Sequence, residues 1–216
     1  MNHPLSVACS WSGGKDSCYA LMISVAQGVI PRAILNVMNE DGKISRSHGL
    51  PAGVLRQQAE ALGLPLIAIQ STWEDYQVNF IKALQNLKTT YAIEALVFGD
   101  IDLQAHRDWE EIVCAKAGLK ALLPLWQRDR KELVLEMLDT PIEAMIVSCN
   151  DVMGPRFLGR TIDSSLVADL EALGVDPCGE NGEYHSLVLN CPLFRRRLDI
   201  PPYTTTRHDG YNFIQW

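Results

Sequence analysis

The chain has 216 residues, of which 47% are hydrophobic and 21% are charged. At roughly 150 residues per domain this length predicts one large domain or one with a smaller lobe, and the composition excludes a disordered, collagen-like or fibrous protein. Nineteen lysines and arginines against 26 acidic residues leave a net charge of −7, which makes the surface a poor general binder of nucleic acid or anionic membrane. An anionic ligand therefore needs a local set of positively charged or N–H groups that neutralises its charge.

The sequence carries no sign of targeting or of membrane insertion. The first residues contain no lysine or arginine, and the apolar run behind them ends at Ser10, which is unlike a signal peptide. No apolar stretch approaches the ~18 residues that indicate a membrane span. The six cysteines form no C-x-x-C pair and lie in apolar segments, which favours reduced thiols over disulfides. We therefore expect a cytoplasmic protein with no membrane partner.

The first 125 residues alternate between short apolar runs, which indicate buried strands, and segments with a helical pattern. Strands are expected over residues 5–9, 33–38, 66–69, 95–98 and 121–125, and helices over residues 16–27, 54–62, 73–87 and 106–117. Successive strand–helix units predict an α/β fold with a parallel five-stranded sheet and helices on both faces. Ligands of such sheets bind beyond the carboxyl ends of the strands, which selects the polar loops 10–17, 39–49 and 99–107.

The pattern changes after Trp126 without an obvious linker. A charged helix is expected over residues 128–138, a strand over 144–148, a second helix over 164–173 and a strand over 185–189. We therefore place a boundary near residue 127, with a larger domain over residues 1–127 and a smaller α+β lobe over residues 128–216. The tail over residues 195–216 is basic and ends in aromatic residues. It is expected to be either a floppy tail or a contact between copies in a homo-oligomer.

The densest motif, S-W-S-G-G-K-D-S, occupies residues 10–17 between the first strand and the first helix. Two adjacent glycines let the backbone turn tightly and expose N–H groups, and the N-terminus of the next helix adds partial positive charge. Lys15 supplies a cation at the same place. These features predict a phosphate-binding loop, which is the local set of groups that an acidic protein needs. The simpler alternative is a serine–glycine turn with an aspartate helix cap.

Three common glycine and nucleophile motifs do not fit this loop. A Walker A loop needs a glycine where Cys9 stands, and the dinucleotide fingerprint G-x-G-x-x-G is absent. A nucleophile elbow is excluded because Ser10 occupies the place of its first glycine. The loop therefore indicates a different class of phosphate site.

The segment S-G-G-K-D-S at residues 12–17 resembles the S-G-G-x-D-S loop of the PP-loop ATP pyrophosphatases, which split ATP into AMP and pyrophosphate. Further segments narrow the resemblance: H-G-L at 48–50, G-D-I at 99–101, H-R-D-W-E-E at 106–111, P-L-W at 124–126, F-L-G-R at 157–160 and C-G-E-N-G-E-Y-H at 178–185. Over about residues 5–195 the chain is similar to the diphthine–ammonia ligase family, except that Ser186 stands where the family usually has threonine. The resemblance implies an ATP-binding sheet of the adenine nucleotide alpha hydrolase-like (HUP) type, followed by a substrate and ammonia lobe.

The resemblance also implies a reaction. ATP and Mg²⁺ activate a carboxylate as an acyl-adenylate with release of pyrophosphate, and ammonia then displaces AMP to give an amide. In the named family the acceptor is diphthine, a modified histidine of elongation factor 2 in eukaryotes and archaea, whereas bacterial relatives must act on something else. Two alternatives stay open: another PP-loop enzyme acting on a small-molecule carboxylate or a tRNA base, and a non-catalytic nucleotide-sensing module. The net charge of −7 and the lack of C-x-x-C count against a nucleic-acid partner.

Matching the loop to the family implies the contacts with ATP. The expected phosphate contacts are the backbone of Gly13 and Gly14, the hydroxyls of Ser12 and Ser17, and the ammonium group of Lys15. Ser10 is also expected in the ATP-binding site. Asp16 is expected to bind Mg²⁺, directly or through water, because Mg²⁺ takes one or two carboxylates together with phosphate oxygens. Capping of the helix is the simpler role for Asp16 and Ser17.

Other candidates follow the second and fourth strands. By analogy with the wider superfamily, adenine is expected along the second strand near Asn36, Val37 and Met38, although a buried strand explains these residues equally well. His48 lies in a glycine-bearing loop, either as a ligand contact or as part of a turn. Gly99 and Asp100 end the fourth strand, where Asp100 either positions Mg²⁺ or substrate or caps a turn.

The helix expected from His106 carries two charged pairs at a spacing of four residues. Arg107 and Glu111 lie on one face, as do His106 and Glu110. The pairs are either surface salt bridges or, in the functional reading, an arginine that binds phosphate or carboxylate and is held by a glutamate. The aromatic residues Tyr91, Trp73, Trp109 and Trp126 are expected to pack in the core or between the lobes.

The second lobe contributes Glu180, Glu183 and His185. The glycines between them let the backbone bend so that the carboxylates converge, and two carboxylates suit the binding of ammonium and the removal of its proton. A polar hairpin turn is the simpler reading. A zinc site of the P-C-x-x-C type is rejected because Asn181 replaces the second cysteine and no H-x-E accompanies it. The candidate catalytic residues are therefore Lys15, Asp16, Asp100, Arg107, Glu180, Glu183 and His185.

Overall fold

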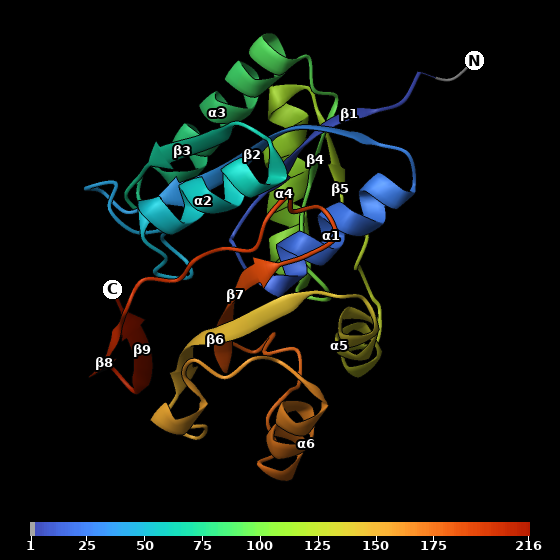
Figure 1. Cartoon of the computed structure of the whole chain (residues 1–216). Helices are drawn as coiled ribbons and strands as arrows, with labels where there is room; N and C mark the ends of the chain where they lie inside the picture. The colour runs from blue at the N-terminus through green and yellow to red at the C-terminus, as the bar shows by residue number, and fades with distance from the viewer. Residues whose placement is uncertain (1–2) are drawn as a thin grey trace.

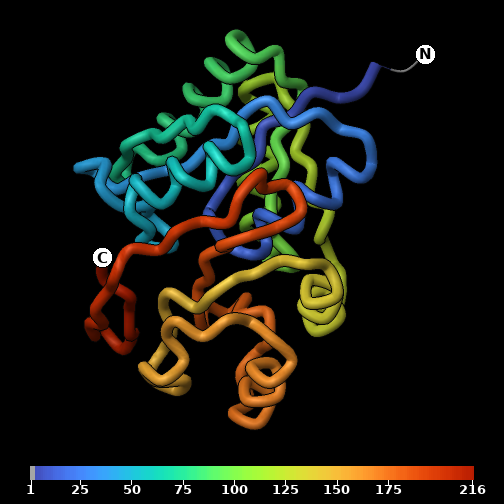
Figure 2. Tube along the Cα trace, viewed as in Figure 1, coloured from blue at the N-terminus to red at the C-terminus, as the bar shows by residue number. Residues whose placement is uncertain are grey.

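A computed structural model describes residues 3–216 of the chain. Met1 and Asn2, which belong to the segment that was expected not to be a signal peptide, lie outside the described residues. The first sheet with its helices occupies the upper part of Figures 1 and 2, and the second sheet with two further helices lies below it. Across residues 3–216, none of the helices combines the length and the apolar character needed to cross a membrane.

The first sheet is parallel throughout, as the alternating pattern predicts. Its strands lie in the order β3-β2-β1-β4-β5, with the bounds Leu66–Gln70, Ile30–Met38, Ser6–Ser10, Ala95–Val97 and Lys120–Leu122. The helices between successive strands are α1 (Lys15–Ala26), α2 (Ala52–Leu62), α3 (Tyr76–Tyr91) and α4 (Gln104–Ala117). Because the chain winds outward in one direction from β1 to β3 and in the other from β4 to β5, the topological switch point lies between β1 and β4, where ligands of such sheets bind.

The helices cover both faces of this sheet. Alternate residues of β1 point to opposite faces, as the pleat requires: Val7 and Cys9 belong to the buried cluster that contains α1 and α2. Ala8 lies between them in sequence and belongs to the cluster that contains Phe80 of α3 and Val113 of α4. The central strands β1 and β4 are therefore buried on both faces, which explains their apolar character.

The second lobe is built on an antiparallel sheet, so the expectation of a smaller α+β lobe is confirmed. Its strands lie in the order β7-β6-β9-β8, with the bounds Tyr184–Asn190, Glu143–Asn150, Tyr211–Gln215 and Thr204–His208. Two helices, α5 (Arg130–Asp139) and α6 (Ser164–Ala172), and one short turn of 3₁₀ helix, η1 (Pro155–Phe157), accompany it. The carboxylates of Asp129 and Asp163 cap the two helices by accepting hydrogen bonds from Glu132 N and Leu166 N.

The C-terminal segment corrects the expectation of a floppy tail. Strands β8 and β9 form a hairpin, and β9 pairs with β6 through Phe213 opposite Ser148. The connecting residues Asp209 and Gly210 both have positive φ, which is the geometry that an Asp-Gly hairpin turn adopts. The D-G signal was present in the sequence, but the basic charge and the terminal position of the segment favoured a tail.

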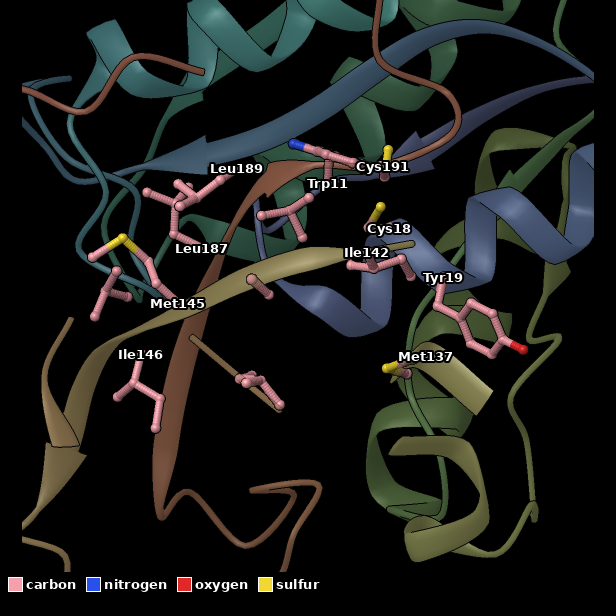
Figure 3. Packing of buried hydrophobic residues seen from close by; sticks show 14 of the residues in the cluster. Trp11, Cys18, Tyr19, Met137, Ile142, Met145, Ile146, Leu187, Leu189 and Cys191 are labelled. Carbon is pink, nitrogen blue, oxygen red and sulfur yellow. The ribbon is translucent and has the colours of Figure 1, made fainter. Parts of the chain in front are cut away.

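The buried core runs without a break from the first sheet into the second lobe. Cys18 and Tyr19 of α1 belong to the same cluster as Met145 of β6 and Leu187 of β7 (Figure 3). All six cysteines are free and buried, which confirms the expectation of unpaired thiols. The two lobes therefore pack against each other through apolar side chains, and strand β7 is held directly beside the phosphate loop.

Candidate active site

A cavity of about 640 Å³ lies at the carboxyl edge of the first sheet, between the two lobes. The three loops selected by the sheet rule all contribute to its wall, and residues 178–186 of the second lobe form the opposite side. The predicted site residues that line it are Ser10, Ser12, Lys15, Asp16, Ser17, His48, Gly99, Asp100, Glu180 and His185. Their roles toward a ligand stay predictions.

The phosphate loop is held in place by contacts that the sequence did not reveal. Gly13 has a φ of +90°, and a Cβ there would lie 2.5 Å from the Leu50 side chain. The Gln58 side chain of α2 donates hydrogen bonds to the carbonyl oxygens of Gly13 and Val188, both at 2.9 Å. The indole N–H of Trp11 donates in turn to Gln58 Oε1 at 2.8 Å. Gln58 therefore links the phosphate loop of the first lobe to strand β7 of the second. Gly13 has no side chain, so it offers the site only its backbone groups.

Lys15 is 4% exposed and connects the loop to the second lobe. Its Nζ donates to both carboxylate oxygens of Asp16 at 2.9 Å and to the carbonyl oxygen of Cys178. Burial opposes the charge of Lys15, but the Asp16 carboxylate outweighs it and raises the Lys15 pKa well above its usual range. The backbone N–H of Lys15 donates to Ser186 Oγ at 3.1 Å. The cation is thus fixed at the first turn of α1, where a phosphate would meet it.

Two neutral histidines lie beside this lysine. The rings of His48 and His185 are 4.4 Å apart between centroids. Burial, with the charge of Lys15, lowers the pKa of His185 to about 4, and burial with the neighbouring His185 and Lys15 lowers that of His48 well below its usual value. Near neutral pH both imidazoles are uncharged, so they can donate or accept a hydrogen bond but add no positive charge for an anion.

A cluster of ionisable side chains lies at the end of β4. His106 Nδ1 and Asp100 Oδ1 are 2.7 Å apart. Glu110 is 3% exposed, and burial, together with a hydrogen bond to Asp100, raises its pKa to about 11. Burial alone would raise the pKa of Asp100. The hydrogen bonds from His106 and Glu110 together have the larger effect, so the net shift of the Asp100 pKa is downward. At neutral pH, Asp100 is therefore ionised and Glu110 is protonated. Glu110 also lines the cavity. The i,i+4 spacing in the sequence did not reveal that its side chain is buried.

Glu180 reaches the same region from the second lobe. Its Oε1 accepts a hydrogen bond from the backbone N–H of Ile101 at 3.4 Å. Burial and the nearby charge of Asp16 raise the pKa of Glu180 to about 7. A carboxyl group with this pKa exchanges a proton readily at neutral pH, which is the property of a general acid or base.

Two predicted catalytic residues do not reach the cavity. Arg107 Nε donates to Glu111 Oε1 at 2.7 Å, and its guanidinium lies 5.0 Å from the centre of the Trp126 ring. Helix α4 turns His106 and Glu110 toward Asp100, which leaves Arg107 and Glu111 on a neighbouring face. Both readings expected this bond between Arg107 and Glu111, so a contact of Arg107 with phosphate or carboxylate stays a prediction.

Glu183 is the second correction. Its carboxylate turns back into its own loop and accepts hydrogen bonds from the backbone and side-chain nitrogens of Asn181 at 3.0 and 3.1 Å. Glu183 immediately precedes strand β7, and its carbonyl oxygen accepts a hydrogen bond from Asn150 N at 2.8 Å. The expectation that Glu180 and Glu183 converge is therefore wrong. Glu183 instead fixes the turn that presents Glu180.

Aromatic residues form part of the cavity wall, which corrects the expectation for Trp73, whereas Trp109 lines the cavity and also packs against the buried Phe80, as expected. Both tryptophans line the cavity together with Tyr76, and Trp73 is 73% exposed. The Tyr76 ring stacks on Trp73 with 5.6 Å between centroids and contacts Trp109 at the same distance. These rings give the cavity an apolar surface that suits the body of a substrate or a base.

The predicted adenine residues divide into two groups. Asn36 borders a hollow of about 80 Å³ that shares Ser10 and Ser12 with the main cavity. Its Nδ2 donates to the Trp11 carbonyl at 2.7 Å, while its buried Oδ1 has no hydrogen-bond partner among the described residues. Met38 is 1% exposed in the core and lines neither hollow, so its expected contact with ATP is corrected.

The part of the chain that the structure describes places no preformed metal centre beside these groups. Among residues 3–216, no three histidine, cysteine, aspartate or glutamate side chains are arranged to hold a metal ion. Asp16 offers one carboxylate beside the phosphate loop. A single carboxylate fits an Mg²⁺ ion that arrives with ATP, since Mg²⁺ keeps several waters and takes its remaining ligands from phosphate oxygens.

The phosphate loop at the switch point of a parallel sheet defines an α/β nucleotide-binding protein of the PP-loop type. Comparison with known families gives a more specific assignment. The chain belongs to the diphthamide synthase family, because models of that family's N-terminal and C-terminal domains match residues 5–121 and 129–215.

Individual relatives agree with this membership. The diphthine–ammonia ligase of Schizosaccharomyces pombe is 30% identical over 92% of this chain, which spans only 36% of that protein. The diphthine–ammonia ligase of Homo sapiens is 28% identical over 97% of this chain and 88% of its own length. A solved structure described as a predicted subunit of tRNA methyltransferase from Methanocaldococcus jannaschii aligns with 90% of this chain and 100% of its own at a TM-score of 0.48 and 18% identity. A structural match of this strength does not indicate function.

Proposed function

We propose that this protein is an ATP-dependent ligase that adenylates a diphthine-like carboxylate and then joins it to ammonia. The observation that carries the proposal is that one cavity is lined both by the phosphate loop of the first lobe and by the ionisable Glu180 of the second. Relatives named diphthine–ammonia ligase support the same reaction class. The acceptor is a carboxylate of the diphthine kind, carried by elongation factor 2 where that modification exists, and we place the reaction in the cytoplasm.

The first step is transfer of the adenylyl group. An oxygen of the acceptor carboxylate attacks the α-phosphorus of ATP, the new oxygen–phosphorus bond forms, and the α–β phosphoanhydride bond breaks so that its electron pair leaves with pyrophosphate. Backbone N–H groups of Gly13, Asp16 and Ser17 would hold the β- and γ-phosphates, since those of Gly14 and Lys15 donate to Ser12 Oγ and Ser186 Oγ. Lys15 would neutralise their charge, and Asp16 would hold the Mg²⁺ that accompanies ATP.

The second step is amide formation. Ammonia attacks the carbonyl carbon of the acyl-adenylate, the carbon–nitrogen bond forms, and the carbon–oxygen bond to AMP breaks with its electron pair on the phosphate oxygen. Only unprotonated ammonia is nucleophilic, so a base must take a proton from ammonium. Glu180 suits this role because its pKa of about 7 leaves a substantial ionised fraction at neutral pH.

The Asp16→Asn variant tests the proposed nucleotide site. It keeps the shape of the side chain but removes the charge that balances buried Lys15 and that would hold Mg²⁺. We expect AMP formation to fall by about 10²–10³-fold, the range seen when one charge-stabilising group is removed from an active site. Asp41→Asn, in the exposed part of loop 39–49, is the matched control and should stay within about twofold.

The readout is the appearance of AMP and pyrophosphate from ATP in the presence of ammonium and a diphthine-bearing acceptor. Full activity of Asp16→Asn would contradict the proposed site. ADP as the product would contradict adenylation, and ATP binding without turnover would favour the nucleotide-sensing alternative. Circular dichroism of both variants separates a catalytic effect from loss of the fold.

A further inference from the structure

The side chain of Arg130, at the start of α5, joins two loops that come from different lobes. Its Nε and Nη2 donate to the two carboxylate oxygens of Asp102 at 2.7 and 2.6 Å, and Asp102 belongs to the loop that follows β4. Its Nη1 donates to Asp176 Oδ2 at 2.6 Å and to Asn181 Oδ1 at 3.0 Å, both of which precede β7. One guanidinium group therefore holds the loop after β4 of the first lobe against the loop before β7 of the second.

This ion pair has the geometry in which a salt bridge near the surface is strongest. An isolated, exposed pair contributes little, whereas a bidentate arginine–carboxylate pair within a network is stronger and fixes direction as well as distance. The side chains of Arg130 and Asp176 are 25% and 10% exposed, so their contact is largely shielded from water. The backbone adds a further contact, because the carbonyl oxygen of Arg130 accepts a hydrogen bond from Cys178 Sγ at 3.1 Å.

Asp176 extends this restraint to the segment that carries Glu180. Its Oδ1 accepts a hydrogen bond from Cys178 N at 2.9 Å, and its Oδ2 accepts one from Glu180 N at 3.3 Å. The Glu180 side chain in turn accepts the hydrogen bond from Ile101 N at 3.4 Å, and Ile101 immediately precedes Asp102. The two loops are thus joined at two places, by Glu180 in the cavity wall and by the guanidinium group outside it.

We infer that Arg130 is a positioning residue for the amide-forming step, because it fixes the loop that carries Glu180 onto the first lobe. This inference rests on the proposed function, in which the Glu180 carboxylate takes a proton from ammonium. Among the described residues, neither Arg130 nor the three polar side chains that it contacts line the cavity, so it acts through the loop. The phosphate loop has separate anchors in Gln58 and Ser186, so adenylation should depend less on Arg130 than amide formation does.

Substitutions of Arg130 separate this role from a general structural one. Arg130→Met removes the guanidinium group, and Arg130→Lys keeps the charge but loses the planar fork that reaches both loops. We expect Arg130→Met to lower the kcat of amide formation by about 10–100-fold, since a shift of about 1 Å at a catalytic group can cost about 10², while ATP–pyrophosphate exchange, measured with acceptor and no ammonium, stays within about twofold. Arg130→Lys should recover only part of the loss.

The matched control is Arg207→Met. Arg207 forms a bidentate pair with Asp151 in the terminal hairpin, so the substitution removes an ion pair of the same kind at a place remote from the two loops. It should leave both rates unchanged. Equal loss of ATP–pyrophosphate exchange and amide formation in Arg130→Met, or full activity of that variant, would overturn the inference.

Asp102→Asn tests whether the contact between the lobes is the cause. It keeps the shape of the side chain but removes the charge that pairs with Arg130. Because both substitutions remove the same contact, the combined variant should lose no more activity than Arg130→Met alone. Losses that simply add in the combined variant would overturn the inference.

Amide hydrogen exchange followed by NMR tests the positioning without any assay of activity. The backbone amides of Ile101, Cys178 and Glu180 are held by hydrogen bonds to carboxylates, so loosening of the loops exposes them to solvent. Their hydrogen exchange should be at least about tenfold faster in Arg130→Met, the size expected for loss of a charged hydrogen bond, and unchanged in Arg207→Met. Asp102→Asn provides the same comparison if Arg130→Met does not fold.

Unchanged protection of these amides in the folded variant would overturn the inference. Faster hydrogen exchange in Arg130→Met, combined with no AMP formation by the unaltered protein, would support the restraint on the loops but contradict the proposed function. The two measurements therefore distinguish failure of the positioning role from failure of the ligase assignment.

Discussion

Gly99→Ala is expected to lower ligase activity by about 100-fold and to destabilise the fold. A Cβ at residue 99 would lie 2.7 Å from Ser17 N and 2.8 Å from the carbonyl carbon of Asp16. Both atoms are backbone of the first turn of α1, so no side-chain rotation can relieve the contact. The helix must move away from β4, which carries Lys15 and Asp16 with it. Displacements of about 1 Å at a catalytic group can reduce rates by about 10².

The destabilisation is expected to be about 2 kcal/mol, in the range for overpacked interiors, which lowers the unfolding midpoint by roughly 4–8 °C. Gly53→Ala in α2 is the matched control, because a Cβ there would find its nearest neighbour, an Arg56 nitrogen, at 3.9 Å. It should stabilise the protein by about 0.5–1 kcal/mol through helix propensity. Differential scanning calorimetry and the AMP assay measure both effects. Gly99→Ala with normal stability and activity would show that α1 and β4 are not in this close contact.

Glu110→Gln is expected to stabilise the folded protein at neutral pH. The pKa of Glu110 is raised from 4.5 to about 11 by burial and by its hydrogen bond to Asp100. Because this pKa is higher in the folded state, the protonated carboxyl favours folding fully below pH 4.5, and this contribution is lost as the pH rises toward 11. Glutamine has no proton to retain. At pH 7 the difference amounts to about 3 kcal/mol as an upper bound, from 1.36 kcal/mol per pH unit.

Urea denaturation at several pH values measures this effect. The gain in free energy of unfolding for Glu110→Gln should be close to zero near pH 4.5 and should grow as the pH rises to 7. Glu111→Gln, whose carboxylate is half exposed and paired with Arg107, should show no such growth. A gain for Glu110→Gln that does not depend on pH would contradict a protonated Glu110 in the folded protein.

The sheet and the phosphate loop could be predicted because their signals are local. Strands buried on both faces appear as short apolar runs, and the loop is a contiguous motif between a strand and a helix. The start of α3 was predicted three residues early, because Asp75 accepts hydrogen bonds from Thr72 and Ser71 and holds residues 72–75 in a turn. The boundary at residue 127 stays a prediction, since one buried core spans both lobes.

The remaining parts of the site depend on tertiary contacts that no local pattern encodes. Glu110 and Arg107 look alike as members of i,i+4 pairs, and only the packing of α4 against Asp100 separates a buried acid from a surface salt bridge. Gln58 looks like any polar residue on a helix, yet it is fully buried and ties the loop to both lobes. The predicted direction of the Glu183 side chain was wrong because its carboxylate accepts hydrogen bonds from Asn181 in the same turn. A sequence pattern does not show such contacts.

The central claim is that the acceptor carboxylate becomes an adenylate before ammonia attacks it. The most direct test supplies the protein with ATP, Mg²⁺, ammonium chloride and a diphthine-bearing acceptor whose carboxylate oxygens are labelled with ¹⁸O, followed by mass spectrometry of the products. Adenylation transfers one labelled oxygen to the phosphate of AMP and leaves pyrophosphate unlabelled. ADP together with labelled inorganic phosphate would show that the carboxylate attacks the γ-phosphorus instead and would contradict the account.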